Sequence, residues 1–162
     1  MEKIFVTVGT HPQQFDRLLK ERDRLAKAGI LNGEIFAQTG YSSFEPKNFG
    51  FRKFLGLQEF DKKLSEANMV ITHAGEGNIG ACIKLGKKMV VVPRRKEFNE
   101  HTNDHQLELA EVVGQKKLGL VAWNPEELNL RLRELEHFRP GKVVSGRIPK
   151  ILDDYVKREL RW

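Results

Sequence analysis

The chain contains a single cysteine, Cys82, so it can form neither an internal disulfide nor a cysteine-rich zinc site. Cys82 lies at helical spacing from Ile79 and Leu85, which predicts a place in the hydrophobic core. Long apolar runs are also missing, since no stretch approaches the roughly 20 apolar residues of a membrane span. The N-terminus begins with an apolar strand pattern instead of a signal peptide, so we expect a cytoplasmic protein.

Positive charge exceeds negative charge, with 28 lysine and arginine residues, 22 aspartate and glutamate residues and a net charge of +6. Such an excess fits a nucleic acid, an anionic membrane surface or a phosphorylated small molecule. The basic residues are scattered, with short clusters such as Arg94–Lys96, and no basic helix carries interleaved aromatic side chains for stacking on bases. The sequence therefore disfavours nucleic acid and leaves the other two partners open.

Apolar strand patterns alternate with helical patterns along the 162 residues, a length that suits one domain. The strand patterns cover residues 3–8, 34–39, 51–55, 69–73, 88–92 and 118–122. The helical patterns cover residues 12–28, 57–67, 78–85, 104–113, 125–138 and about 148–161. Strands this apolar, separated by helices, predict an α/β fold, a Rossmann-like and mostly parallel sheet with helices on both faces.

Polar or glycine-rich loops follow most of the predicted strands. They are Gly9–Pro12, Thr39–Phe44, His73–Asn78 and Pro93–Asn103. In parallel sheets, ligands bind beyond the carboxyl ends of the strands, where the strand order reverses. The four loops therefore predict one shared cleft.

The stretch HAGEGN, residues 73–78, joins a predicted strand to a predicted helix. Small residues at positions 74, 75 and 77 allow a close approach of the backbone to an anion, and the helix start offers N–H groups and a favourable dipole. His73 supports a phosphate site because it can donate a hydrogen bond to a diphosphate, whereas the carboxylate of Glu76 counts against one. A tight turn without a ligand is the alternative.

Two common nucleotide motifs are absent from the sequence. The dinucleotide fingerprint belongs after the first strand, with an acidic residue ending the second. Here the first strand runs into VGTHPQQ and the second ends in Gln38-Thr39-Gly40. There is also no Gly-Lys-Ser/Thr phosphate loop, so a nicotinamide dehydrogenase and an ordinary nucleotide triphosphatase are both disfavoured.

The stretch EHTNDHQ, residues 100–106, has three interpretations. His101 and His105 are four residues apart and could bind a metal ion, but the sequence shows no third ligand and no HExxH glutamate. Asp104, His105 and Gln106 could instead face the cleft and bind a polyhydroxyl group. An ordinary helix cap at Asn103 or Asp104 is the third interpretation.

The stretches HAGEGNIGACIKLGKKMVVVP and NDHQLELA resemble the nucleotide-sugar-binding, C-terminal half of MurG-type (family 28) glycosyltransferases. The likeness is greatest to split enzymes in which this half is a separate chain, such as the catalytic subunit of the dolichol-linked N-acetylglucosamine transferase and bacterial capsule or exopolysaccharide transferase subunits. The resemblance covers nearly the whole chain and implies half of a GT-B fold. Residues 1–162 would form one domain, and the helix at about 148–161 could dock a partner.

The resemblance also implies roles for individual residues. The donor diphosphate would be bound by His73, Gly75, Glu76, Gly77 and Asn78. The uracil would lie against Phe54, Leu55 and Leu57, the donor sugar against Asp104, His105 and Gln106, and the cleft floor would contain Gly9 and Thr10. Many relatives carry a ribose-binding glutamate at the place of Ala81, so ribose must be bound differently here. No metal and no cofactor are implied, since the UDP-sugar is the donor substrate.

We therefore expect the catalytic subunit of a two-component inverting glycosyltransferase. It would transfer a hexose (N-acetylglucosamine, galactose or glucuronic acid) to a polyprenyl-diphosphate-linked acceptor presented by a membrane-associated partner subunit. The chain would then be cytoplasmic and peripheral to the membrane. His11, on a loop at the same cleft, is the candidate general base, and His73 would assist the departing UDP. A non-catalytic nucleotide-sugar-binding or regulatory module and a self-sufficient homodimeric transferase are the alternatives.

Overall fold

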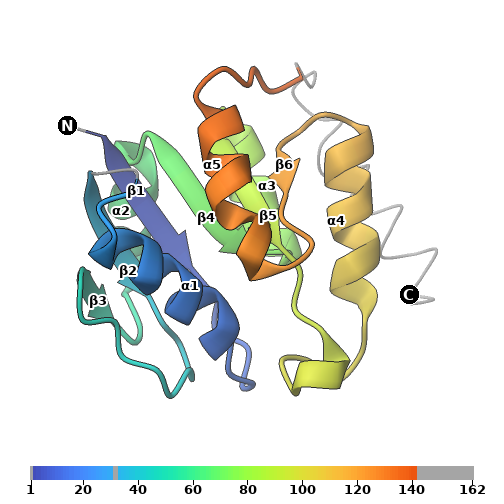
Figure 1. Ribbon diagram of the computed structural model, residues 1–162. Helices are drawn as coiled ribbons and strands as arrows, with labels where there is room; N and C mark the ends of the chain where they lie inside the picture. Colours follow the sequence, from blue (N-terminus) through green and yellow to red (C-terminus); the bar gives the residue numbers. More distant parts are fainter. Residues whose placement is uncertain (1, 31–32, 142–162) are drawn as a thin grey trace.

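The computed structural model describes residues 2–30 and 33–141. Its centre is a six-stranded sheet with the order β3-β2-β1-β4-β5-β6, in which every pair of neighbours is parallel (Figure 1). The strands are β1 (Lys3–Thr7), β2 (Glu34–Gln38), β3 (Gly50–Arg52), β4 (Met69–His73), β5 (Lys88–Val92) and β6 (Leu120–Val121). The α-helices are α1 (Asp16–Lys27), α2 (Leu57–Glu66), α3 (Glu76–Lys84), α4 (His105–Gln115) and α5 (Leu128–Leu135). Two 3₁₀ turns, η1 (Lys96–Phe98) and η2 (Pro125–Glu127), precede α4 and α5.

Helices cover both faces of the sheet, as the sequence predicts. Side chains alternate along each strand, so Ile71 of β4 belongs to the cluster under α1 and α5, while the adjacent Val70 belongs to the cluster under α2, α3 and α4. Cys82 is 1% exposed and packs in the second cluster, which confirms its predicted place. The α/β, Rossmann-like architecture is therefore confirmed.

The first helix begins later than the sequence predicts. Pro12 suggested a helix start, but α1 begins at Asp16. The carbonyl oxygens of Gln13 and Gln14 accept hydrogen bonds from the guanidinium of Arg94. Because those carbonyls bind a side chain from a distant loop, residues 12–15 form a loop over the sheet edge.

The other helix boundaries also differ from the prediction. α3 begins at Glu76 instead of Asn78, because Gly75 serves as its N-cap and Gly77 lies within the first turn. α4 runs through Gly114 to Gln115, and the chain turns only at Lys117, whose φ is 55°. The third and last strands are shorter than predicted, and the predicted helix at about 148–161 lies outside the described residues.

The strand order positions the site. β1 lies between β2 and β4, so the chain order reverses between β1 and β4. Parallel strands bring the loops after β1, β2, β4 and β5 to the same edge of the sheet, where such folds bind ligands. Among the described helices, none is long and apolar enough to cross a membrane.

Helix α5 offers a matched test of this packing. Leu132 is fully buried in the first cluster, whereas Leu130 on the same helix is 54% exposed. We expect Leu132→Ala to lower the free energy of unfolding by about 2–5 kcal/mol, because it removes buried methyl groups and leaves a cavity. Leu130→Ala should change it by less than about 0.5 kcal/mol. Urea unfolding followed by circular dichroism would measure both, and equal effects would contradict the packing of α5.

Candidate functional site

His73, the last residue of β4, is 8% exposed and lies between two glycines. A Cβ placed on Gly9 would come within 2.4 Å of His73 Nε2, and a Cβ placed on Gly75 within 2.3 Å of Cε1 and 2.5 Å of Nε2. Gly9 also has a φ of +76°, which a side chain would strain. Both positions therefore require glycine, and the Nε2 edge of the ring faces the gap between the loops after β1 and β4.

The amino end of α3 lies beside this imidazole. Its N-cap Gly75 makes no side-chain capping bond, and the first hydrogen bond within the helix runs from the Ile79 N–H to the Gly75 carbonyl at 3.0 Å. The preceding N–H groups of the first turn have no acceptor within the helix, and the helix dipole adds positive potential there. This geometry suits an anion such as a phosphate.

Asn78 lies in the first turn of α3, so its backbone N–H belongs to this amino end. Its side-chain Nδ2 points inward and donates to the hydroxyl groups of Thr7 at 3.4 Å and Thr72 at 3.3 Å. These bonds fasten the first turn of α3 to the ends of β1 and β4. The side chain of Asn78 is therefore engaged within the fold, and a role at a diphosphate stays a prediction for its main chain.

Gln106, in the first turn of α4, connects His73 to the loop after β5. Its Oε1 accepts a hydrogen bond from the backbone N–H of Arg94 at 3.0 Å, and its Nε2 lies 3.1 Å from His73 Nδ1. The side chain is buried, with 7% of its surface exposed. The sequence predicts Gln106 and His73 at one cleft but carries no sign that they bond to each other.

Arg94, from the short basic cluster Arg94–Lys96, is fully buried. Its guanidinium donates to the carbonyl oxygens of Val8, Gln13, Gln14 and Glu100. Burial lowers the pKa of Arg94 to about 10, so the side chain stays charged at neutral pH. It places a fixed positive charge beneath the loops that surround His73.

Glu100 partly balances this buried charge. Its carboxylate, 1% exposed, accepts two hydrogen bonds from the guanidinium of Arg17 at 2.8 and 3.0 Å and one from the backbone N–H of Arg95 at 3.0 Å. The pair joins α1 to the loop after β5. Such bidentate contacts are geometrically specific, so they help to hold the two sides of the cleft in register.

His11 and His101 stack on each other next to this network, with ring centroids 4.1 Å apart. Burial and then Arg94 lower the pKa of His11. Burial, then His11 and Arg94, lower the pKa of His101 to about 4. Burial, then Arg94 and the neighbouring histidines, lowers the pKa of His73 to about 3. The three imidazoles are therefore neutral at physiological pH.

The residues predicted to contact uracil lie just before α2 and at its first residue. Phe54 is 44% exposed and Leu57 is 78% exposed, while Leu55 packs partly against the second cluster. Tyr41, in the loop after β2, meets Phe54 edge-on with ring centroids 5.0 Å apart. The sequence did not indicate Tyr41 as a neighbour of Phe54, although its loop is among the four expected at the cleft.

The first turn of α4 confirms the capping interpretation in part. The side-chain oxygen of Asn103 accepts from the N–H of His105 at 3.0 Å, whereas Asp104 accepts from the N–H of Lys96 at 2.9 Å. Asp104 is exposed, His105 is half-buried, and Thr10 is exposed on the loop after β1. Among residues 2–30 and 33–141, no group of three or more histidine, cysteine or acidic side chains converges as a metal site would require.

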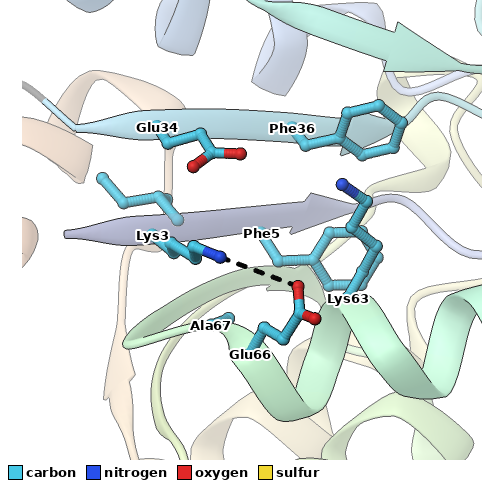
Figure 2. Close-up of a pocket in the computed structure, with 8 residues that line it drawn as sticks. Lys3, Phe5, Glu34, Phe36, Lys63, Glu66 and Ala67 are labelled. Carbon is cyan, nitrogen blue, oxygen red and sulfur yellow. Dashed lines mark ion pairs between the residues drawn. The ribbon is translucent and has the colours of Figure 1, made fainter. Parts of the chain in front are cut away.

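A small crevice lies away from this cluster, between α2 and the sheet (Figure 2). Lys3 and Glu34, the first residues of β1 and β2, are part of its lining, and Lys3 forms an ion pair with Glu66 at 3.8 Å. Lys63 lies over the ring of Phe36. The crevice is thus associated with the amino ends of these strands, whereas the cluster around His73 lies at their carboxyl ends.

Comparison with known proteins now places the chain in a family. Residues 3–142 match the glycosyltransferase family 28 C-terminal domain. The chain belongs to this family. It is 35% identical over 119 residues, 68% of its length, to the UDP-N-acetylglucosamine transferase subunit ALG13 of Homo sapiens, and 34% identical over the same share to that of Mus musculus. It spans 10% of the length of each of these relatives.

Solved structures show the same fold. An NMR structure of ALG13 matches 94% of the chain and 94% of its own length, with a TM-score of 0.61 and 16% identity. MurG of Acinetobacter baumannii matches over 97% of this chain and 50% of its own, with a TM-score of 0.59 and 19% identity. The predicted GT-B-type domain is therefore confirmed, and the family 28 resemblance holds.

The lowered histidine pKa values predict how the stability of this domain depends on pH. Folded His73 binds a proton only near pH 3, whereas the unfolded chain does so near 6.5. The unfolded state therefore gains protons first as the pH falls below 6.5, and the folded state loses stability. Between about pH 6.5 and pH 5 this loss should reach roughly 2 kcal/mol for His73.

Urea unfolding of His73→Gln at about pH 7.5 and pH 5 should show a smaller loss of stability than the wild type. His137→Gln, at an exposed histidine after α5, serves as the matched control and should keep the wild-type profile. An identical pH dependence in His73→Gln and the wild type would show that His73 titrates normally.

Proposed function

We propose that this domain is the catalytic, UDP-sugar-binding subunit of a two-component inverting glycosyltransferase that acts on a polyprenyl-diphosphate-linked acceptor. The observation that carries the proposal is the gap between Gly9 and Gly75, where the Nε2 edge of His73 meets the amino end of α3, whose N-cap Gly75 makes no side-chain capping bond. Backbone N–H groups, the helix dipole and an imidazole converge there. That combination suits the diphosphate of a nucleotide sugar.

The neighbouring surfaces suggest how the rest of the donor is bound. The exposed ring of Phe54 and the side chains of Leu55 and Leu57 offer an apolar surface for uracil. Asp104, His105 and Gln106 offer polar atoms for the sugar. The amide of Gln106 keeps a second hydrogen-bonding position at each end beyond its contacts with Arg94 and His73.

The relatives favour one donor among the three compatible sugars. Both mammalian relatives are named as UDP-N-acetylglucosamine transferase subunits, which supports UDP-N-acetylglucosamine over the galactose and glucuronic acid donors. The word subunit supports a partner chain. We propose that this partner is membrane-associated, presents the lipid-linked acceptor and holds the domain at the cytoplasmic face of the membrane.

The proposed reaction needs charge stabilisation and a base. The acceptor hydroxyl oxygen attacks the anomeric carbon as the bond from that carbon to the UDP oxygen breaks, with inversion, and the bonding pair leaves with UDP. The α3 amino end and His73 stabilise the added negative charge on the leaving diphosphate. Since the pKa of His73 is about 3, the imidazole serves as a neutral hydrogen-bond donor.

His11 is our candidate for the base that takes the acceptor proton. Its lowered pKa keeps the ring neutral, and a neutral imidazole has a lone pair for a proton. The contact of its Nδ1 with the Gln13 N–H is long, at 3.5 Å, so that contact does not fix which ring nitrogen carries the proton. Full turnover of His11→Ala with partner and acceptor would transfer this role to another residue.

Calorimetric titration tests the donor site. We expect metal-independent binding of UDP and the UDP-sugars, no binding of NAD, and affinity reduced about tenfold to a hundredfold in His73→Ala, the loss typical of a hydrogen bond to a charged group. His137→Ala is the matched control. Absence of uridine affinity, or equal affinity in His73→Ala, would contradict the site. Binding of UDP without transfer in the presence of any partner and acceptor would favour the non-catalytic module.

A further inference from the structure

The amide of Gln106 lies between two groups whose hydrogen-bonding roles restrict each other. The backbone N–H of Arg94 can only donate, so the amide atom 3.0 Å from it must be the oxygen. The other end of the amide is then the nitrogen, which can only donate as well. It lies 3.1 Å from Nδ1 of His73, so Nδ1 must accept.

From this chain of contacts we infer that Gln106 is a positioning residue, which holds neutral His73 with its proton on Nε2 and directs that N–H into the gap between Gly9 and Gly75. A neutral imidazole carries one ring proton. If Nδ1 accepts from Gln106, the proton must be on Nε2, the nitrogen that faces the two glycines. His73 thus presents a donor to the mouth of the site.

The opposite tautomer would be unfavourable at both ring nitrogens. A proton on Nδ1 would face the amide N–H of Gln106, so two donors would meet in a buried place. The lone pair of Nε2 would then face the gap and would repel an anionic oxygen. Leaving buried donors unpaired is costly. A flip of the Gln106 amide would not relieve this cost, because the Arg94 N–H would then lose its acceptor, Oε1.

The surrounding charges oppose the third state, a doubly protonated ring. Arg94 is fully buried next to the cluster, and His11 and His101 stack beside it. Desolvation of the ring, and then these groups, lower the pKa of His73. The donated N–H therefore persists at physiological pH without an ionised imidazole. Its use toward a phosphate oxygen rests on the proposed function, whereas the tautomer rests on the contacts alone.

The ring nitrogens of His73 can be observed directly. In the ligand-free, ¹⁵N-labelled protein near neutral pH, long-range ¹H–¹⁵N correlation should show Nδ1 with the shift of an unprotonated nitrogen and Nε2 with that of a protonated one. The wild-type spectrum decides this whether or not any variant folds. Protonated Nδ1, or a rapidly averaged mixture of the two tautomers, would overturn the inference.

Substitution of Gln106 tests whether this residue determines the tautomer of His73. Gln106→Glu places a carboxylate against Nδ1, so we expect Nδ1 to become protonated and the pKa of His73 to rise. Gln106→Leu should give an averaged mixture. Gln115→Glu, which makes the same change at an exposed position of α4, should keep the wild-type ring shifts. Unchanged His73 shifts in a folded Gln106 variant would contradict the assignment.

A titration with UDP, which lacks the donor sugar, separates positioning from direct sugar contact. Gln106→Leu should weaken UDP binding about tenfold, because the imidazole loses a fixed donor, and Gln115→Glu should bind as the wild type does. Unchanged UDP affinity in Gln106→Leu would restrict Gln106 to the sugar and overturn the positioning role. Failure of the wild type to bind UDP would overturn the proposed function and leave the tautomer result standing.

Discussion

The site depends on the burial of one guanidinium. Arg94 lies beyond the end of β5 and donates to the carbonyl oxygens of Val8, Gln13 and Gln14 in the loop after β1. These bonds connect the loops that flank β4, so they position the gap into which His73 faces. The Val8 carbonyl is buried and those of Gln13 and Gln14 are partly buried, so they need donors. A guanidinium with several N–H groups can serve them together. Removal of Arg94 would release both loops.

The same charge determines the electrostatics of the cluster. Burial of the rings is the largest cause that lowers the pKa of the nearby imidazoles, and the buried cation lowers it further, so the rings stay neutral while the region remains positive. The charge of Arg94 and the amino end of α3 together give a positive potential that attracts an anion. This attraction requires no protonation of a histidine. Gln106 adds a directional element, because it determines which nitrogen of His73 carries the proton. Arg94 and the amino end of α3 thus attract an anion, whereas Gln106, in the first turn of α4, orients the N–H of His73.

Much of the fold was predictable from periodicity. The apolar runs at β1, β4 and β5 and the helices between them predict a parallel sheet, and that sheet implies a shared edge for the loops. The contacts of Arg94 were not predictable, because backbone carbonyls in a distant loop carry no sequence signal. The same contacts explain why the helix expected at Pro12 begins at Asp16. The Gln106–His73 pair was missed for a similar reason, since its geometry depends on the Arg94 backbone.

The most direct test of the central claim is the location of UDP on the domain by backbone amide chemical-shift mapping. We expect the largest ¹H–¹⁵N shifts at Gly9 and at residues 75–78 in the first turn of α3, with smaller shifts near Phe54. Amide protons that donate to phosphate oxygens should move most. If the largest shifts instead fall at the crevice of Figure 2, around Lys3 and Glu34, or if the first turn of α3 does not respond, the diphosphate site proposed here is wrong.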